Sequence, residues 1–284
     1  MKVWIALQSV NHNHPQRPLF MNDDLIYVYC LSNGYSFAQN FPESKDFKVI
    51  EWRGYSIFVK IVSAIEFSEE NLKKNISDIQ WLEPNAREHI SIICKIMEKC
   101  TVIPFKFGTI FNSEENLKKF IDDYSDSLRE NLVALDRKDE WAVKIYCDRH
   151  IIIDQIDELS EEAAAIEKQI MASSPGKAFL MKRKKNELIE NEINRICKKY
   201  GQEFYYNLAA LSHTTCLNNL IPSEFTGRKE DMILNATFLV SRDEKDEFLA
   251  TVAKLKKESS KLGFDFEATG PWPPFTFISI KEKK

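Results

Sequence analysis

Glycine and proline are scarce in this chain of 284 residues, which holds 8 glycines and 10 prolines. Long flexible linkers are therefore not expected, and any joint between domains must be short. No apolar run approaches the roughly 20 residues that a membrane-spanning helix needs, so we expect no membrane partner. The first residues, Met1–Leu7, contain one lysine and a short apolar stretch without a clear cleavage site, which indicates a strand and not a secretory signal. We therefore expect a cytoplasmic protein.

An excess of positive charge is also missing. The net charge is -4, since the first 136 residues hold 15 Lys+Arg and 19 Asp+Glu and the remainder holds 24 of each. Neither half is basic enough to bind phosphate backbones by counterion release, so we expect no nucleic acid partner. The 44% hydrophobic and 29% charged residues are typical of a globular protein, and the length predicts two domains of about 150 residues each.

Common motifs of catalysis and of metal binding are absent as well. The sequence has no Gly-x-Gly loop, no His-Glu-x-x-His and no Gly-x-Ser-x-Gly, so we expect no cofactor and no catalytic residue. His12 and His14 have the spacing of neighbouring ligands on a strand, but no third ligand is close in sequence, and we predict no metal site. The six cysteines form no Cys-x-x-Cys pair and are predicted to be reduced, mostly buried thiols.

Residues 1–136 have the pattern of an N-terminal α+β domain, in which residues 1–24 form an extra segment. A β-hairpin is predicted around Gly54, because a tight turn there needs a residue that adopts positive φ. The remaining predictions for this domain are strands at 25–31 and 101–107, a helical block at 68–97 and a helix at 113–135.

Residues 137–284 are predicted to form a second α+β domain. Apolar residues step by four and three along both halves of the segment 150–200, and Pro175-Gly176 interrupts them, which predicts an antiparallel coiled-coil hairpin. The other predicted elements are strands at 141–147, 233–240, 264–268 and 275–280, a helix at 241–262 and a loop at 213–230. Four strands and one packed helix indicate a ferredoxin-like sandwich.

Two segments are unusually apolar or rigid. Residues 101–111 form an apolar strand and its exit, and residues 269–277 combine three prolines with aromatic side chains. Filling the core and fixing turns explains most of these residues. The functional interpretation is that one aromatic side chain stays partly exposed and anchors an apolar partner. The residues proposed for partner binding are Phe105, Phe107, Trp272 and Phe275, and those proposed to shape turns are Pro104, Gly108, Pro175, Gly176, Gly270, Pro271, Pro273 and Pro274.

These segments carry a resemblance to a known family. The sequence resembles the gas vesicle accessory proteins F and L in five stretches that occur in the family's order and spacing. The stretches are 102–111 (VIPFKFGTIF), 140–146 (EWAVKIY), 174–180 (SPGKAFL) before a lysine-rich run, 235–240 (NATFLV) and 269–277 (TGPWPPFTF).

The resemblance implies a two-domain protein without enzymatic activity. It implies a ferredoxin-like part joined to a coiled-coil hairpin in the C-terminal domain. It further implies a protein that assists gas vesicle formation, contacts the small hydrophobic shell protein and other accessory proteins, and stays at the vesicle as a minor component. The family usually begins near the strand at 25–31, so residues 1–24 depart from its pattern.

Two other interpretations remain open at this point. In the first, the protein is a scaffold that binds other accessory proteins through the coiled coil; its basic run, Lys182–Lys185, is either a solvated face or a contact for an acidic partner. In the second, the protein is an enzyme whose site lies between the domains and uses scattered groups such as His89, Lys106 and Arg149. A lone histidine on a helix is more often a surface or hydrogen-bonded core residue, and no local motif supports catalysis.

Overall fold

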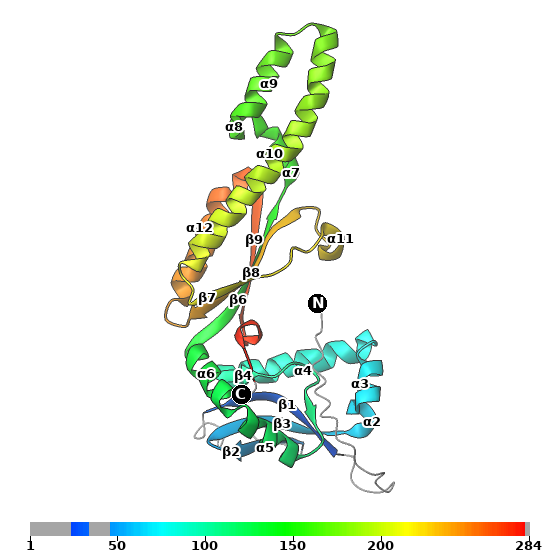
Figure 1. The fold of residues 1–284 in the computed structure, drawn as a ribbon, viewed down its shortest axis with the longest axis vertical. Coiled ribbons are helices and arrows are strands. Elements are labelled where there is room, and N and C mark those ends of the chain that lie inside the picture. Colours follow the sequence, from blue (N-terminus) through cyan, green and yellow to red (C-terminus); the bar gives the residue numbers. More distant parts are fainter. Residues whose placement is uncertain (1–23, 34–45, 282–284) are drawn as a thin grey trace. The chain divides into compact units, whose positions relative to one another are not determined.

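The computed structural model describes residues 24–33 and 46–281 (Figure 1). The predicted strand within residues 1–7, the extra segment up to residue 23, and the pair His12 and His14 lie outside the described residues. The internal contacts divide the chain into two compact units. The first comprises Met1–Lys138 and Trp272–Lys284, and the second comprises Asp139–Pro271.

An antiparallel sheet forms the base of the first unit, and five of its strands lie in the described residues. The strand order is β2-β3-β1-β4, and β5 also pairs with β1. The predicted hairpin is confirmed: Arg53 and Gly54 turn it with φ values of 54° and 80°, the positive values that a tight hairpin turn requires. The strands are β1 (Asp24–Ser32), β2 (Phe47–Trp52), β3 (Tyr55–Ser63), β4 (Val102–Pro104) and β5 (Ile110–Phe111).

Helices connect and cover this sheet. The longest, α4 (Ile79–Met97), contacts β1 and β4 and buries His89, Ile93, Ile96 and Met97. The predicted helix at 113–135 is two helices, because the chain leaves helical geometry at Tyr124. The other helices of the first unit are α2 (Ala64–Phe67), α3 (Glu69–Asn75), α5 (Glu114–Asp123) and α6 (Ser125–Leu135).

The second unit contains a sheet in the order β7-β8-β6-β9, with four strands in the described residues. The helices α10 (Pro175–Ala209) and α12 (Lys245–Ser259) contact each other and both contact β8, so they close the hydrophobic core on the sheet. The strands are β6 (Lys138–Cys147), β7 (Thr214–Leu217), β8 (Asp231–Ser241) and β9 (Phe264–Trp272), and the short helices are α11 (Ser223–Thr226) and η1 (Ser260–Leu262).

A helical arm, residues 149–196, is inserted between β6 and the part of α10 that crosses the sheet. It runs outward through α7 (Arg149–Asp154), α8 (Ile156–Leu159) and α9 (Glu161–Met171) and returns in α10 (Figure 1). The prediction that Pro175-Gly176 forms the turn was wrong. Pro175 is the first residue of α10 and Gly176 the second, because a proline at that position lacks only an N–H that would have no partner within the helix.

The fourth strand of the second sheet is not the predicted one. It is β7, in the tract expected to be a loop, where four residues pair antiparallel with Ala236–Leu239 of β8. Residues 275–280 instead begin with the short helix η2 (Phe275–Phe277), because Pro273 and Pro274 before it have no N–H to donate to a sheet. The chain from Trp272 onward is grouped with the first unit, whereas the sequence placed all of 137–284 in the second domain.

Candidate functional site

The side chain of His89 lies at the centre of a group of aromatic rings in the first unit. It is buried on the inner face of α4, and both ring nitrogens have partners. Nε2 lies 3.0 Å from the carbonyl oxygen of Phe105, and Nδ1 lies 2.7 Å from the hydroxyl of Tyr27. We call His89 together with Tyr27, Tyr29, Phe107 and Phe275 the His89 cluster.

The hydrogen bonds determine the protonation of His89. A carbonyl oxygen only accepts, so Nε2 carries the proton and Nδ1 accepts from the Tyr27 hydroxyl. Burial lowers the pKa of His89 to about 4, against 6.5 for a free histidine, and burial raises the pKa of Tyr27. Both side chains are therefore neutral at pH 7. The backbone N–H of Gly108 adds a third, longer hydrogen bond to the Tyr27 hydroxyl, at 3.4 Å.

The first apolar segment wraps around this cluster. Its strands β4 and β5 both pair with β1, and the chain between them bulges away while Phe105 N–H donates to the Tyr29 carbonyl oxygen. Gly108 allows the bulge, because its φ of 79° is unfavourable for other residues. Pro104 is buried in β4, at the edge of the sheet, as its lack of an N–H predicts.

Two of the four aromatic residues proposed for binding meet at His89. The ring of Phe107 lies edge-on to the imidazole at 5.7 Å between centroids, and the ring of Phe275 stacks on it at 6.3 Å. Both are half-buried. Phe105 is a core residue whose ring packs against Phe120, while its carbonyl oxygen bonds to His89.

The second segment brings Trp272 to the surface. Its side chain is 39% exposed, whereas the two prolines that follow it are buried. Gly270 has a φ of 147°, and a Cβ at this position would lie 2.8 Å from the Trp141 ring. Only glycine fits here without a steric clash. The exposed Pro271 follows through a cis peptide bond.

Side chains of α6 hold the end of this segment. The Asn131 amide accepts from the backbone N–H of Ser279 at 3.0 Å and donates to the carbonyl oxygen of the same residue at 2.9 Å. The Ser127 hydroxyl donates to that oxygen as well and accepts from the N–H of Lys281. These contacts imitate the pairing of a neighbouring strand. The sequence does not single out either polar residue, because the pattern of this helix shows only its apolar stripe.

Two hollows of the first unit differ greatly in volume. A recess beside the cluster, lined in part by Tyr27, Phe67 and Phe107, has a volume of about 10 Å³, enough for about one water molecule. A larger hollow of about 420 Å³ is lined by residues of α4 alone. Within residues 24–33 and 46–281, no group of three or more His, Cys, Asp or Glu is placed to hold a metal ion, and no helix has the length and apolarity to span a membrane.

The enzyme alternative named three groups, His89, Lys106 and Arg149, and each has its own environment. His89 uses both nitrogens in the core, and Lys106 is exposed. Arg149 belongs to the second unit, where its guanidinium pairs with Glu190 at 2.6 Å and with Asp231 at 3.3 Å. His89 is therefore a hydrogen-bonded core residue, one of the two usual roles of a lone histidine on a helix.

Comparison with known proteins identifies the family. A sequence model described as gas vesicle synthesis protein GvpL/GvpF matches residues 25–279. The chain belongs to this family. The resemblance found in the sequence is therefore confirmed, and the match includes both segments that surround His89.

Relatives and solved structures of the GvpL/GvpF family agree with this assignment. Gas vesicle protein L of Streptomyces sp. (strain CB03234) is 24% identical over 222 residues, which cover 78% of this chain and 79% of that protein. Gas vesicle protein F1 of Halobacterium salinarum is 24% identical over 234 residues, with 80% and 81% covered. The crystal structure of GvpF from Anabaena sp. PCC7120 has a TM-score of 0.65 at 17% identity and covers 91% of this chain and all of its own. This likeness confirms an α+β fold with two antiparallel sheets.

Proposed function

We propose that this member of the GvpL/GvpF family is a non-enzymatic assembly factor. It binds the small hydrophobic shell protein of the gas vesicle in the cytoplasm, assists nucleation or assembly, and stays at the vesicle as a minor component. The family description supports a role in gas vesicle synthesis. The binding step is the part proposed here from the geometry of the first unit.

The observation that carries this proposal is the exposure of Trp272, which precedes Phe275 of the His89 cluster by three residues. Large aromatic residues supply much of the binding energy at interfaces when a rigid support holds them. Two buried prolines follow Trp272, and Phe275 rests on the neutral imidazole of His89. The tryptophan therefore projects from a segment that is already ordered, and its ordering costs little at binding.

The hydrogen bonds of His89 favour binding over catalysis. A general base needs a free nitrogen and a pKa near the working pH, whereas here both nitrogens have partners and burial lowers the pKa to about 4. The sequence contains no phosphate-binding glycine loop that would support an ATP-driven cycle. The protein would therefore bind the shell protein stoichiometrically, without a cycle driven by ATP.

The test is co-expression with the shell protein and comparison of two variants. Trp272→Ala is expected to lower the amount of shell protein that co-purifies, by tenfold or so if the side chain contributes about 1.4 kcal/mol. The matched control is Ile65→Ala, since Ile65 is an 81% exposed apolar residue of the same unit, and it is expected to bind normally. Normal binding by a folded Trp272→Ala variant would contradict the proposed anchor, and a wild-type chain that captures no shell protein would contradict the function.

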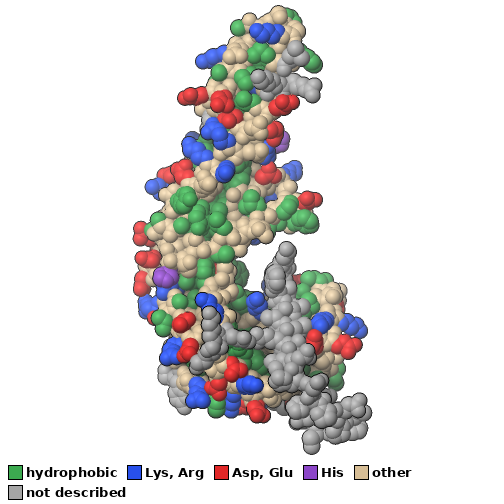
Figure 2. Space-filling model, in the orientation of Figure 1, with side chains coloured by type: hydrophobic (Ala, Val, Ile, Leu, Met, Phe, Trp, Pro, Cys, Tyr) green, Lys and Arg blue, Asp and Glu red, His purple; other side chains and the backbone are tan. Residues whose placement is uncertain are grey.

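A second candidate function is favoured by the end of the arm. Met171 and Phe179 are 77% and 73% exposed. The sequence of residues 168–185 contains six basic and no acidic residues, and Lys185 pairs with Glu167 just before it. Figure 2 shows basic and apolar side chains at the end of the arm. Apolar side chains beside positive charge suit an acidic partner protein, such as another accessory protein of the vesicle. This is the scaffold role, and it is compatible with the first.

Substitution of the two exposed apolar side chains tests the scaffold role. The double variant Met171→Ser, Phe179→Ser is expected to keep its stability, because both side chains are exposed, and to lose capture of the other accessory proteins while shell-protein capture persists. Tyr206→Ser, at a 67% exposed position farther along α10, is the control. Unchanged capture of every accessory protein by the double variant would exclude the arm as the binding site.

We further propose that the second unit combines a ferredoxin-like fold with an antiparallel coiled coil. Its strand order β7-β8-β6-β9, with helices between β6 and β7 and between β8 and β9, supports a ferredoxin-like topology. The contact of α9 with α10 along the arm supports an antiparallel coiled coil. A crystal structure of the protein would test both.

A further inference from the structure

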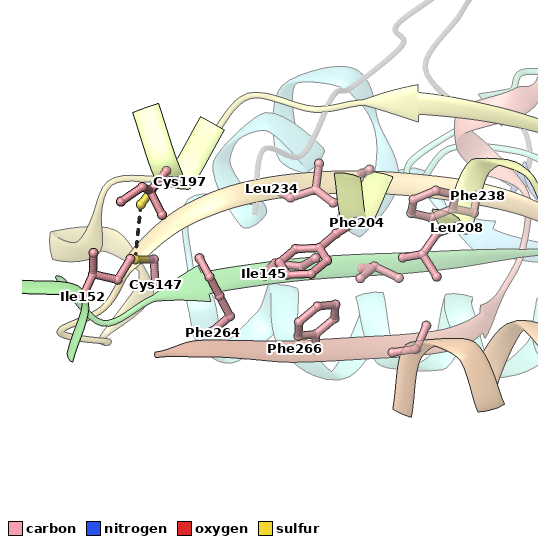
Figure 3. Close-up of a cluster of buried hydrophobic side chains, with 14 of the residues drawn as sticks. Ile145, Cys147, Ile152, Cys197, Phe204, Leu208, Leu234, Phe238, Phe264 and Phe266 are labelled. Carbon is pink, nitrogen blue, oxygen red and sulfur yellow. Dashed lines mark hydrogen bonds between the residues drawn. The ribbon is translucent and has the colours of Figure 1, made fainter. Parts of the chain in front are cut away.

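Two cysteines of the second unit face each other where the arm leaves the sheet. Cys147 is the last residue of β6 and is fully buried, and Cys197 lies on α10 with 9% of its surface exposed. Their sulfur atoms are 3.2 Å apart, and both are free thiols (Figure 3). Neither residue has a role in the proposed function.

The surroundings of the pair favour contact between the two thiols. Ile152 of α7 lies beside them, and both sulfur atoms belong to the hydrophobic core of the second unit (Figure 3). The paired charges of Arg149 and Asp231 are close enough to act on both thiols. A disulfide has a sulfur–sulfur distance of about 2.05 Å, so the two atoms need to approach by about 1 Å. One sulfur atom comes from the end of β6 and the other from α10.

The two thiols differ in chemical character. In the neutral pair the Cys197 thiol donates to the Cys147 sulfur. When Cys197 is ionised, the Cys147 thiol donates to it instead, and this bond together with Arg149 lowers the pKa of Cys197 more than burial and Asp231 raise it. The hydrogen bond with Cys197 and burial raise the pKa of Cys147. Cys197 is also the more exposed of the two, so it is the thiol that meets an oxidant first.

We propose that Cys147 and Cys197 form an oxidisable pair that a small peroxide converts to a disulfide. The Cys197 thiolate attacks one oxygen of hydrogen peroxide, the O–O bond breaks, and a sulfenic acid and hydroxide form, which the displaced proton turns into water. The Cys147 thiol then attacks the sulfenic sulfur, the S–S bond forms, and a second water leaves. The two thiols are oxidised by two electrons in total, and one peroxide is reduced to two waters.

The consequence of the disulfide is a covalent closure of the arm. All of α7, α8 and α9 and the outer part of α10 lie between the two cysteines. The bond therefore ties the outgoing and returning ends of the arm at its base. It restricts the unfolded chain and any opening of α10 away from β6.

The test uses the full-length native protein. After exposure to hydrogen peroxide, the protein is unfolded in the presence of N-ethylmaleimide, digested without reductant and analysed by mass spectrometry. The expected result is a cross-linked peptide joining Cys147 to Cys197 and two fewer alkylated thiols than the six of the sequence. Dithiothreitol is expected to reverse the link, and the oxidised protein is expected to melt at a higher temperature than the reduced protein.

Two variants separate the pair from its surroundings. Cys216→Ser removes a half-buried thiol of the same unit and is expected to leave the link intact. Cys147→Ser is expected to abolish it and to leave Cys197 as a sulfenic acid that dimedone traps, a result that requires a folded variant by circular dichroism. Six alkylated thiols after peroxide treatment of the wild type, a link between other cysteines, or overoxidised Cys197 without a link would each overturn the proposal.

Discussion

The imidazole of His89 stacks on the ring of Phe275, with centroids 6.3 Å apart and ring planes 28° apart. One residue comes from the central helix of the first unit and the other from the last part of the chain. The contact explains why the segment after Trp272 is grouped with the first unit. It also brings together the two segments that the sequence singled out, since the Phe105 carbonyl oxygen accepts from the same imidazole.

Removing the Tyr27 hydroxyl tests the hydrogen bonds beneath this contact. Tyr27→Phe leaves the Nδ1 of His89 without a donor in a buried position, which is expected to lower the free energy of unfolding by about 1–3 kcal/mol. Urea denaturation of the variant and the wild type measures the difference. Tyr206→Phe, at an exposed position, is the control and is expected to be neutral. A Tyr27→Phe variant as stable as the wild type would show that the bond contributes nothing net.

The low pKa of His89 predicts a loss of stability in mild acid. In the folded state the pKa is about 4 and in the unfolded chain it is near 6.5, so between these values only the unfolded state binds the proton. The contribution of the neutral His89 to the free energy of unfolding is complete above about pH 6.5 and is lost as the pH falls toward about 4. Between about pH 7.5 and about pH 5 the expected loss is about 2 kcal/mol. Urea titrations at each pH measure it.

The variant His89→Gln provides the control for this pH dependence. Glutamine does not titrate, so the carboxylates that titrate in both proteins cancel in the difference between them. The stability of the variant is expected to fall less between about pH 7.5 and about pH 5 than that of the wild type. Parallel curves for the two proteins would contradict a buried neutral histidine.

The contacts of Asn131 predict the local stability of the C-terminal segment. Asn131→Ala removes both amide bonds to Ser279, which is expected to cost about 1 kcal/mol of local stability, or about fivefold faster amide exchange. Hydrogen exchange at Ser279 and Lys281 measures it. Asn207→Ala, where the amide bonds only to the preceding turn of its own helix, is the control. Unchanged exchange would mean that the Ser127 hydroxyl and the ring contacts hold the segment without Asn131.

Two glycines with left-handed backbone allow the cost of this conformation to be distinguished from the cost of a steric clash. Gly227 and Gly263 have φ values of 69° and 86°, and an added Cβ meets nothing within 4 Å at the first but lies 2.9 Å from the Asp148 carbonyl oxygen at the second. Gly227→Ala is expected to cost about 1 kcal/mol, from the left-handed conformation alone. Gly263→Ala is expected to cost about 2–4 kcal/mol, because the crowding adds to it. Thermal or urea unfolding compares the two, and equal losses would contradict the close approach.

Local sequence patterns predicted much of the architecture. The strand β1 and the β2–β3 hairpin were predicted correctly, because β-branched and aromatic residues alternate there around a turn with Gly54. The helices of the arm followed from apolar residues spaced by four and three. The exchange of strands in the second unit was missed, since β7 has only four residues and two of them are threonines, too short for a period to be visible.

The candidate site was predicted in part. The sequence selected Phe107, Trp272 and Phe275 from their unusual surroundings, but it also selected Phe105, whose ring is in the core. For His89 it predicted a surface or hydrogen-bonded core residue, with a catalytic group as the alternative. No local pattern reports that a histidine will accept from Tyr27 and donate to the Phe105 carbonyl oxygen, since these partners lie far from it in sequence.

The sequence by itself determined the family, the two α+β parts and the positions of most helices and strands. These depend on composition, on periodicity and on turn residues, which act over a few neighbouring residues. Only the tertiary structure decided that the last segment returns to the first unit, that His89 is neutral, and that Cys147 meets Cys197. Such contacts depend on which surfaces are buried together, because desolvation and packing act between residues that the chain brings close only after it has folded.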